Sequence, residues 1–226
     1  MPAGQILLFG LLVLVALAAV FPGKRLQQRL ESSSYSDPLS LAYLAAWLRA
    51  QPEQAHLRLV MARRQLGDGE VDAAELTLRP LLQPLAQGSP VRAEAELLQH
   101  DILFRRLWQQ EPGSPAFMAA RQAFLVELTR MQAYEWTPEQ LQKFASEAES
   151  LDAPELAQSY LERLLKVAPE RETAIRAELA AMALGRGHYS DAAENYFLAM
   201  EHARTLDERR HYFMSGVSAL QSGNLL

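Results

Sequence analysis

The chain contains no cysteine. This absence excludes disulfide bonds, thiolate zinc sites, iron–sulfur clusters and a cysteine nucleophile, but it does not fix the compartment, because a chain without thiols suits oxidising and reducing spaces alike. An excess of basic residues is also lacking, since 22 Lys and Arg stand against 27 Asp and Glu and the net charge is −5. A protein that binds nucleic acid by neutralising phosphates needs the opposite balance. We therefore expect no nucleic-acid partner.

Motifs for catalysis or cofactor binding are lacking as well. The sequence has no phosphate loop, no G-x-S-x-G, no dinucleotide fingerprint and no His-Glu-x-x-His. No two of the five histidines stand four residues apart on a helix: His56, His100, His188, His202 and His211. The acidic residues Glu147, Glu149 and Asp152 lie beside a predicted turn, where nothing marks a cleft. We expect a non-catalytic protein with no cofactor and no metal.

Long apolar runs are absent except at the start of the chain. Residues 6–21 are uninterruptedly apolar and carry no charge. A bilayer core requires roughly 17–25 residues of helix, so we predict a transmembrane anchor in residues 1–23 and a polar linker in residues 24–37. A cleaved signal peptide is an alternative, because residues 16–18 read Ala-Leu-Ala, although no basic segment precedes the run. A buried core helix is the third alternative.

Helical periodicity dominates after Asp37, because apolar residues recur at intervals of three and four and no segment alternates with period two. A capping residue stands directly before proline at four predicted helix starts: Asp37-Pro38, Ser89-Pro90, Ser114-Pro115 and Thr137-Pro138. The predicted helices are 38–50, 54–67, 72–86, 90–110, 115–133, 138–150, 154–167, 171–185, 190–204 and 207–221. The loops between them are short, so neighbouring helices should be antiparallel.

An internal repeat organises these helices. Residues 69–74 (GEVDAA) match residues 187–192 (GHYSDA), and in each copy an alanine stands seven residues before the glycine. The pattern resembles the tetratricopeptide repeat (TPR), a helix–turn–helix unit of about 34 residues. The resemblance implies close helix contacts at small residues. Its position 8 falls on Ala62, Ala145, Ala180 and Gly216, and its position 20 falls on Ala74, Ala157 and Ala192. The predicted fold class is all-α, with an N-terminal transmembrane helix and a TPR-like antiparallel helix-pair solenoid over residues 38–226.

The sequence departs from the repeat pattern at several places. Arg58 and Arg176 occupy a position that the family usually fills with a large aromatic residue, Pro80 should kink its helix, and residues 88–133 carry no clear repeat signature. Arg58 and Arg176 are our candidate partner-binding residues in the solenoid groove, or alternatively packing residues whose charged ends reach solvent.

The last predicted helix carries an apolar face for which the sequence offers no partner. This face consists of Tyr212, Phe213, Val217 and Leu220. Because a terminal repeat needs a polar outer face, we expect the solenoid to be truncated at its C-terminus.

An anchor, a polar linker and TPR-like repeats are the arrangement of a membrane-anchored scaffold for protein–protein interaction. Residues 39–75 also resemble the start of the PelB-type scaffolds of bacterial Pel exopolysaccharide export. That resemblance implies a single-pass protein of the bacterial inner membrane with periplasmic repeats that bind export components. The positive-inside rule applied to Lys24, Arg25 and Arg29 favours instead a cytoplasm-facing TPR adaptor in lipopolysaccharide assembly. An α-solenoid domain of a polysaccharide-processing enzyme is the alternative of another class.

Overall fold

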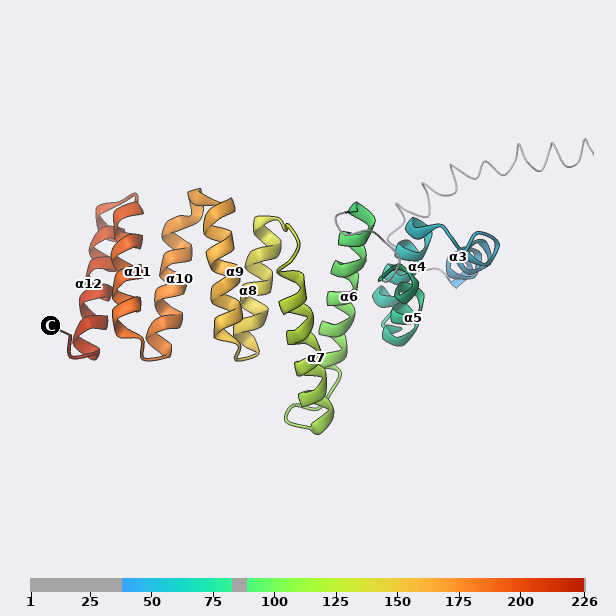
Figure 1. Cartoon of the computed structure of the whole chain (residues 1–226), viewed down its shortest axis with the longest axis horizontal. Coiled ribbons are helices and arrows are strands. Elements are labelled where there is room, and N and C mark those ends of the chain that lie inside the picture. Colours follow the sequence, from blue (N-terminus) through green and yellow to red (C-terminus); the bar gives the residue numbers. More distant parts are fainter. Residues whose placement is uncertain (1–37, 83–88, 226) are drawn as a thin grey trace, which may run out of the picture. The chain divides into compact units, whose positions relative to one another are not determined.

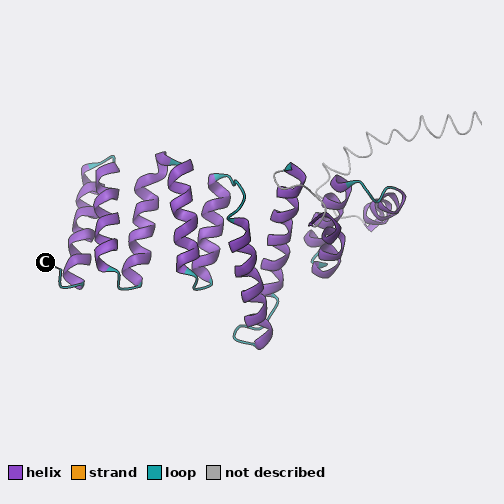
Figure 2. Ribbon diagram, viewed as in Figure 1, coloured by secondary structure: helices purple, strands orange, loops and turns teal. Residues whose placement is uncertain are grey.

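The computed structural model describes residues 38–82 and 89–225. Helices account for all the regular structure in these two ranges, as Figure 2 shows. The helices are α3 (Pro38–Ala50), α4 (Ala55–Gly67), α5 (Val71–Leu82), α6 (Pro90–Trp108), α7 (Pro115–Met131), α8 (Pro138–Ser150), α9 (Pro154–Val167), η1 (Pro169–Arg171), α10 (Glu172–Gly185), α11 (Tyr189–His202) and α12 (Leu206–Ser222). The predicted all-α architecture is confirmed for the described residues.

The predicted anchor and linker, residues 1–23 and 24–37, lie outside the described residues. Within the described ranges, no helix has both the length and the apolar character that crossing a membrane requires. The described part of the chain divides after Ile102 into two compact units.

Most predicted helix boundaries agree with the structure to within two residues. The predicted helix 72–86 begins at Val71 and is described as far as Leu82. The helix predicted at 171–185 is preceded by η1, a single 3₁₀ turn that begins at Pro169. Pro80 lies inside α5, two residues before its described end, so its missing N–H falls in the last turn of that helix.

The predicted cap-proline starts are present wherever the structure describes them. The Ser114 hydroxyl accepts the Phe117 N–H at 3.0 Å, and the Ser89 hydroxyl accepts the Arg92 N–H at 3.1 Å. Thr137 and Gln140 form a reciprocal capping box. The Asp37 cap lies outside the described residues. These local hydrogen bonds fix where α6, α7 and α8 begin.

In the first unit, α4 and α5 form an antiparallel hairpin around small residues. Ala62 and Ala74, the predicted tight positions, are completely buried. Gly69 turns the chain between the two helices with φ of +84°, a conformation that favours glycine. Leu59, Leu78 and the α6 residues Ala95, Leu98 and Ile102 complete one apolar cluster with them. The core of this unit is therefore the hairpin together with the first part of α6.

In the second unit, α7 to α12 lie side by side in chain order (Figure 1). Ala145, Ala157, Ala180 and Ala192, the predicted small positions, are buried. Aromatic side chains pack beside these alanines, and the ring centroids of Phe144 and Tyr160 are 5.4 Å apart. The predicted small-residue register is thus observed as helix–helix packing.

Side chains also join elements about one repeat apart along the second unit. Arg163 donates to the Gln132 carbonyl at 2.9 Å and to the Tyr134 carbonyl at 2.5 Å, spacings of 31 and 29 residues. Arg186 pairs with Glu155 at 2.7 Å, again 31 residues away. Arg171 pairs with Glu139 at 3.2 Å, across 32 residues. These contacts join α9 to the segment after α7, and they join the segments before and after α10 to α8 and α9.

The apolar face expected on the last helix has a partner in part. Leu220 packs against the buried cluster of Ala192, Ala193 and Ala219, and the Phe213 ring lies 6.2 Å from the Phe197 ring on α11, centroid to centroid. The Phe213 side chain remains 48% exposed. The face therefore divides between contact with α11 and solvent.

Candidate partner-binding site

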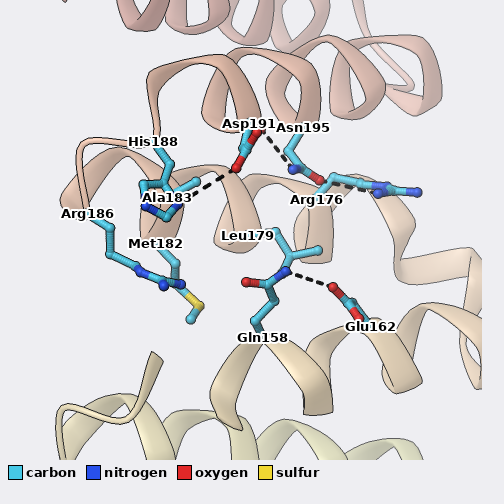
Figure 3. A pocket seen from close by; sticks show the side chains of 10 residues that line it. All are labelled: Gln158, Glu162, Arg176, Leu179, Met182, Ala183, Arg186, His188, Asp191 and Asn195. Atoms are coloured by element: carbon cyan, nitrogen blue, oxygen red, sulfur yellow. Dashed lines mark hydrogen bonds and ion pairs between the residues drawn. The ribbon is translucent and has the colours of Figure 1, made fainter. Parts of the chain in front are cut away.

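A polar pocket lies where α9, α10 and α11 meet in the second unit (Figure 3). Its cavity has a volume of about 120 Å³. The lining residues are Gln158, Glu162, Arg176, Leu179, Met182, Ala183, Arg186, His188, Asp191 and Asn195. Most of these side chains are polar, so the pocket can exchange hydrogen bonds with polar groups of a partner.

Arg176 is held in this pocket by groups from two helices. Its Nε donates to Glu172 Oε1 at 3.3 Å, one turn earlier on α10, and its Nη1 donates to Asn195 Oδ1 of α11 at 3.3 Å. The other Glu172 oxygen lies 3.5 Å from His202 Nε2. The Arg176 side chain is 26% exposed. A half-buried arginine side chain with two long hydrogen bonds retains N–H groups that can donate to a carboxylate or carbonyl of a partner.

The other charged side chains of the pocket each have a polar partner nearby. Arg186 contacts Glu155 at 2.7 Å, Gln158 donates to Glu162 at 2.8 Å, and His188 Nδ1 lies 3.7 Å from Asp191 Oδ2. Positive and negative groups alternate around the rim, as Figure 3 shows. This arrangement favours a partner that carries both signs of charge, such as a polypeptide segment, over a polyanion.

The two arginines predicted as binding residues lie in different surroundings. Arg176 lines the pocket on α10. Arg58 lies in the first turn of α4, half-buried, and its Nε donates to the Pro52 carbonyl at 3.1 Å. Arg58 thereby bonds to the loop that precedes its own helix. Arg58 belongs to the first unit and Arg176 to the second.

Several residues of the site were not identified from the sequence. Arg186 and Asn195 line the pocket as Arg176 does. A signal was present for one contact, since Glu172 and Arg176 stand four residues apart with opposite charges. Asn195 carries no comparable signal, because its role depends on how α11 packs against α10.

Comparisons with known proteins do not assign the chain to a family. No protein-family model matches the chain, and no curated protein matches it. Among solved structures, the chain is similar to a thermophilic TPR protein of Thermus thermophilus, with 21% sequence identity and a TM-score of 0.45. The match covers 80% of this chain and 89% of that one. The description of this chain as TPR-like helix pairs rests on its own packing at the small-residue positions.

Proposed function

We propose that the chain is a non-catalytic scaffold that binds protein partners through the pocket of α9, α10 and α11. The observation that carries the proposal is the half-buried Arg176 side chain, which lines an accessible polar pocket between stacked helix pairs. Stacked helix pairs present side chains from successive helices along one surface, which suits extended polypeptide segments. Arg58 is proposed as a second contact on the first unit.

Membrane attachment is the second part of the proposal. The charge-free run at residues 6–21 supports a single-pass anchor, and the resemblance of residues 39–75 to PelB-type scaffolds supports an inner-membrane protein with its repeats in the periplasm. On this proposal the partners are components of exopolysaccharide export. The second candidate function is a cytoplasm-facing adaptor in envelope assembly. It is favoured by the positive-inside rule, because basic residues follow the apolar run at Lys24, Arg25 and Arg29.

A photo-cross-linking amino acid tests the binding proposal. It replaces Gln158 in the pocket of the intact chain in bacterial membranes, and as a control it replaces Gln122, which is exposed on α7. We expect a discrete protein adduct from position 158 that is absent from position 122. Adducts that are the same from both positions would contradict a partner site at this pocket.

A reporter fused after Leu226 tests the topology. Alkaline phosphatase activity in the membrane fraction would support the periplasmic proposal. Fluorescence of a cytoplasm-folding protein in that fraction would favour the adaptor. Phosphatase activity in the soluble periplasmic fraction would show that residues 6–21 are a cleaved signal peptide.

A further inference from the structure

The polar pocket occupies a place that the preceding repeat packs with apolar and aromatic side chains. A shift of 35 residues, which relates the small positions of the two repeats, also relates Arg176 to Leu141 and Asn195 to Tyr160. Leu141 is 1% exposed and Tyr160 is completely buried. Polar groups at such a helix–helix contact cost free energy unless they have partners of their own. The exchange therefore indicates a role beyond packing for Arg176 and Asn195.

Arg176 belongs to a chain of polar contacts that runs between α10 and α11. On one side of it, Asn195 Oδ1 accepts from the guanidinium (Figure 3), and Asn195 Nδ2 donates to the Asp191 carbonyl at 2.9 Å. On the other side, the Glu172 carboxylate contacts Arg176 through Oε1 at 3.3 Å and His202 through Oε2 at 3.5 Å. One carboxylate is thus shared between an arginine and a histidine. The charge of an arginine is fixed, whereas imidazole is the side chain that changes charge between about pH 5 and pH 8.

Among the charged groups around His202, Glu172 is the one within contact distance. His202 lies in the last turn of α11, where the helix dipole favours a positive charge, and its side chain is 49% exposed. The other charged groups at this end of α10 and α11 belong to η1, to α11 itself and to the turn into α12: Glu170, Arg171, Glu201, Arg204 and Glu208. Within the described residues, none of these five forms an ion pair with His202. Protonation of His202 therefore acts first on Glu172.

The charge on His202 determines how strongly Glu172 offsets the charge of Arg176. When the imidazole is neutral, the carboxylate acts on the guanidinium alone, and the two opposite charges compensate each other. When the imidazole is protonated, the same carboxylate is shared between two cations, so the guanidinium attracts a carboxylate or carbonyl of a partner more strongly. Solvent weakens the effect, because the three side chains are partly exposed.

We propose that His202 makes partner binding at the polar pocket depend on pH, with tighter binding at about pH 5.5 than at about pH 8. The inference rests on the proposed function, because Arg176 is the binding residue on which His202 acts. His202 lies outside the residues that line the pocket, so it is a positioning residue that acts through Glu172. The Kd should be lower at the acidic pH by roughly two- to fourfold, the effect of one partly exposed ion pair.

Nuclear magnetic resonance tests the coupling without any partner. The intact chain is labelled with isotopic arginine in mild detergent, and the Nε chemical shift of Arg176, assigned by its loss in Arg176→Gln, is followed from about pH 8 to about pH 5.5. It should titrate in the wild-type chain and in His188→Gln but stay constant in His202→Gln. His188 is the matched control, because it is also half-exposed and lies 3.7 Å from a carboxylate, that of Asp191. An Arg176 shift that is independent of pH, or that titrates equally in His202→Gln, would overturn the proposal.

Binding is measured with the protein that the cross-linker at position 158 captures. Calorimetry gives its Kd at both pH values for the wild-type chain and for His202→Gln. We expect the two- to fourfold difference in the wild-type chain and no difference in His202→Gln. Glu172→Gln should also abolish the difference, because it leaves Arg176 uncompensated at both pH values.

Two results of the binding measurement would sink the proposal, and they differ in what else they refute. A wild-type Kd that is the same at both pH values, or a difference that persists in His202→Gln, contradicts the role of His202 and leaves the pocket as a binding site. Failure to capture any protein at position 158 refutes the role of His202 together with the proposed function.

Discussion

Side chains from outside α7 stabilise its C-terminal end, and removing one hydroxyl there should measurably lower the stability. The last four carbonyls of an α-helix have no partner within the helix. The Tyr160 hydroxyl of α9 donates to the Leu128 carbonyl at 2.5 Å, and Trp136 Nε1 donates to the Met131 carbonyl at 2.7 Å. Both donors are buried, so water does not replace them.

Tyr160→Phe keeps the ring and its contact with Phe144 but removes the hydroxyl. A buried carbonyl left without a donor costs about 1–3 kcal/mol. For a unit of this size, 1 kcal/mol lowers Tm by roughly 2–8 °C. We therefore expect Tm to fall by roughly 5 °C. Thermal unfolding of the intact chain in mild detergent, monitored by circular dichroism at 222 nm, measures this change. Burial also raises the pKa of the Tyr160 hydroxyl, so the phenol stays neutral and the effect should be the same from pH 6 to pH 8.

The matched control is Tyr196→Phe, because the Tyr196 ring is half-buried on α11 and makes no hydrogen bond or ring contact with a described residue. Its Tm should change by less than about 1 °C, since a change that removes no buried contact is usually worth under ~0.5 kcal/mol. If Tyr160→Phe and Tyr196→Phe melt alike, the hydroxyl does not cap α7 and the argument is wrong.

Three further predictions follow from the packing and the caps. Replacing Ala74 or Ala192 by Leu should overpack a fully buried contact and lower the free energy of unfolding by about 1–3 kcal/mol. Leu at the exposed Ala181 is the control and should be tolerated. Equal Tm values for all three variants would refute the repeat register. Arg163→Met should lower Tm, because two carbonyls after α7 lose their donor, and double substitution with Tyr160→Phe should be non-additive. Backbone N–H groups of Thr205 and Arg204 hold the pKa of Glu208 below its usual range, so this carboxylate stabilises α12 above its ordinary pKa of about 4.3. The stabilisation should disappear as pH falls through the lowered pKa, and Glu208→Gln should remove that pH dependence of Tm.

Helix starts and close helix contacts could be predicted from the sequence, because the interactions that determine them involve residues close together in the chain or at a regular spacing. The starts of α7 and α8 follow from Ser114 and Thr137, whose hydroxyls bond within three residues, and the tight positions follow from alanines at repeat spacing. Thr205 and Glu208 form a second capping box that the sequence pattern Thr-x-x-Glu also signals, although it was not identified in advance.

Contacts between successive repeats were not predictable in the same way. Arg163 reaches carbonyls about 30 residues earlier, and nothing local to Arg163 distinguishes it from a solvent-exposed arginine. The setting of Arg176 also depends on α11, because Asn195 comes into reach only once the two helices have packed. The candidate residue could therefore be chosen from the repeat pattern, while the pocket around it could not.

The binding claim is tested most directly by the affinity of the protein captured from position 158. Calorimetry gives the Kd of that protein for the wild-type chain, for Arg176→Gln and for Arg130→Gln. Arg130→Gln is the control, because Arg130, like Arg176, pairs with a carboxylate on its own helix, Glu127, at 2.7 Å. We predict that Arg176→Gln raises Kd by roughly tenfold, the loss of one charge-assisted hydrogen bond, and that Arg130→Gln leaves it unchanged. An unchanged Kd for Arg176→Gln, with the variant folded as judged by its Tm, would contradict the proposed partner site.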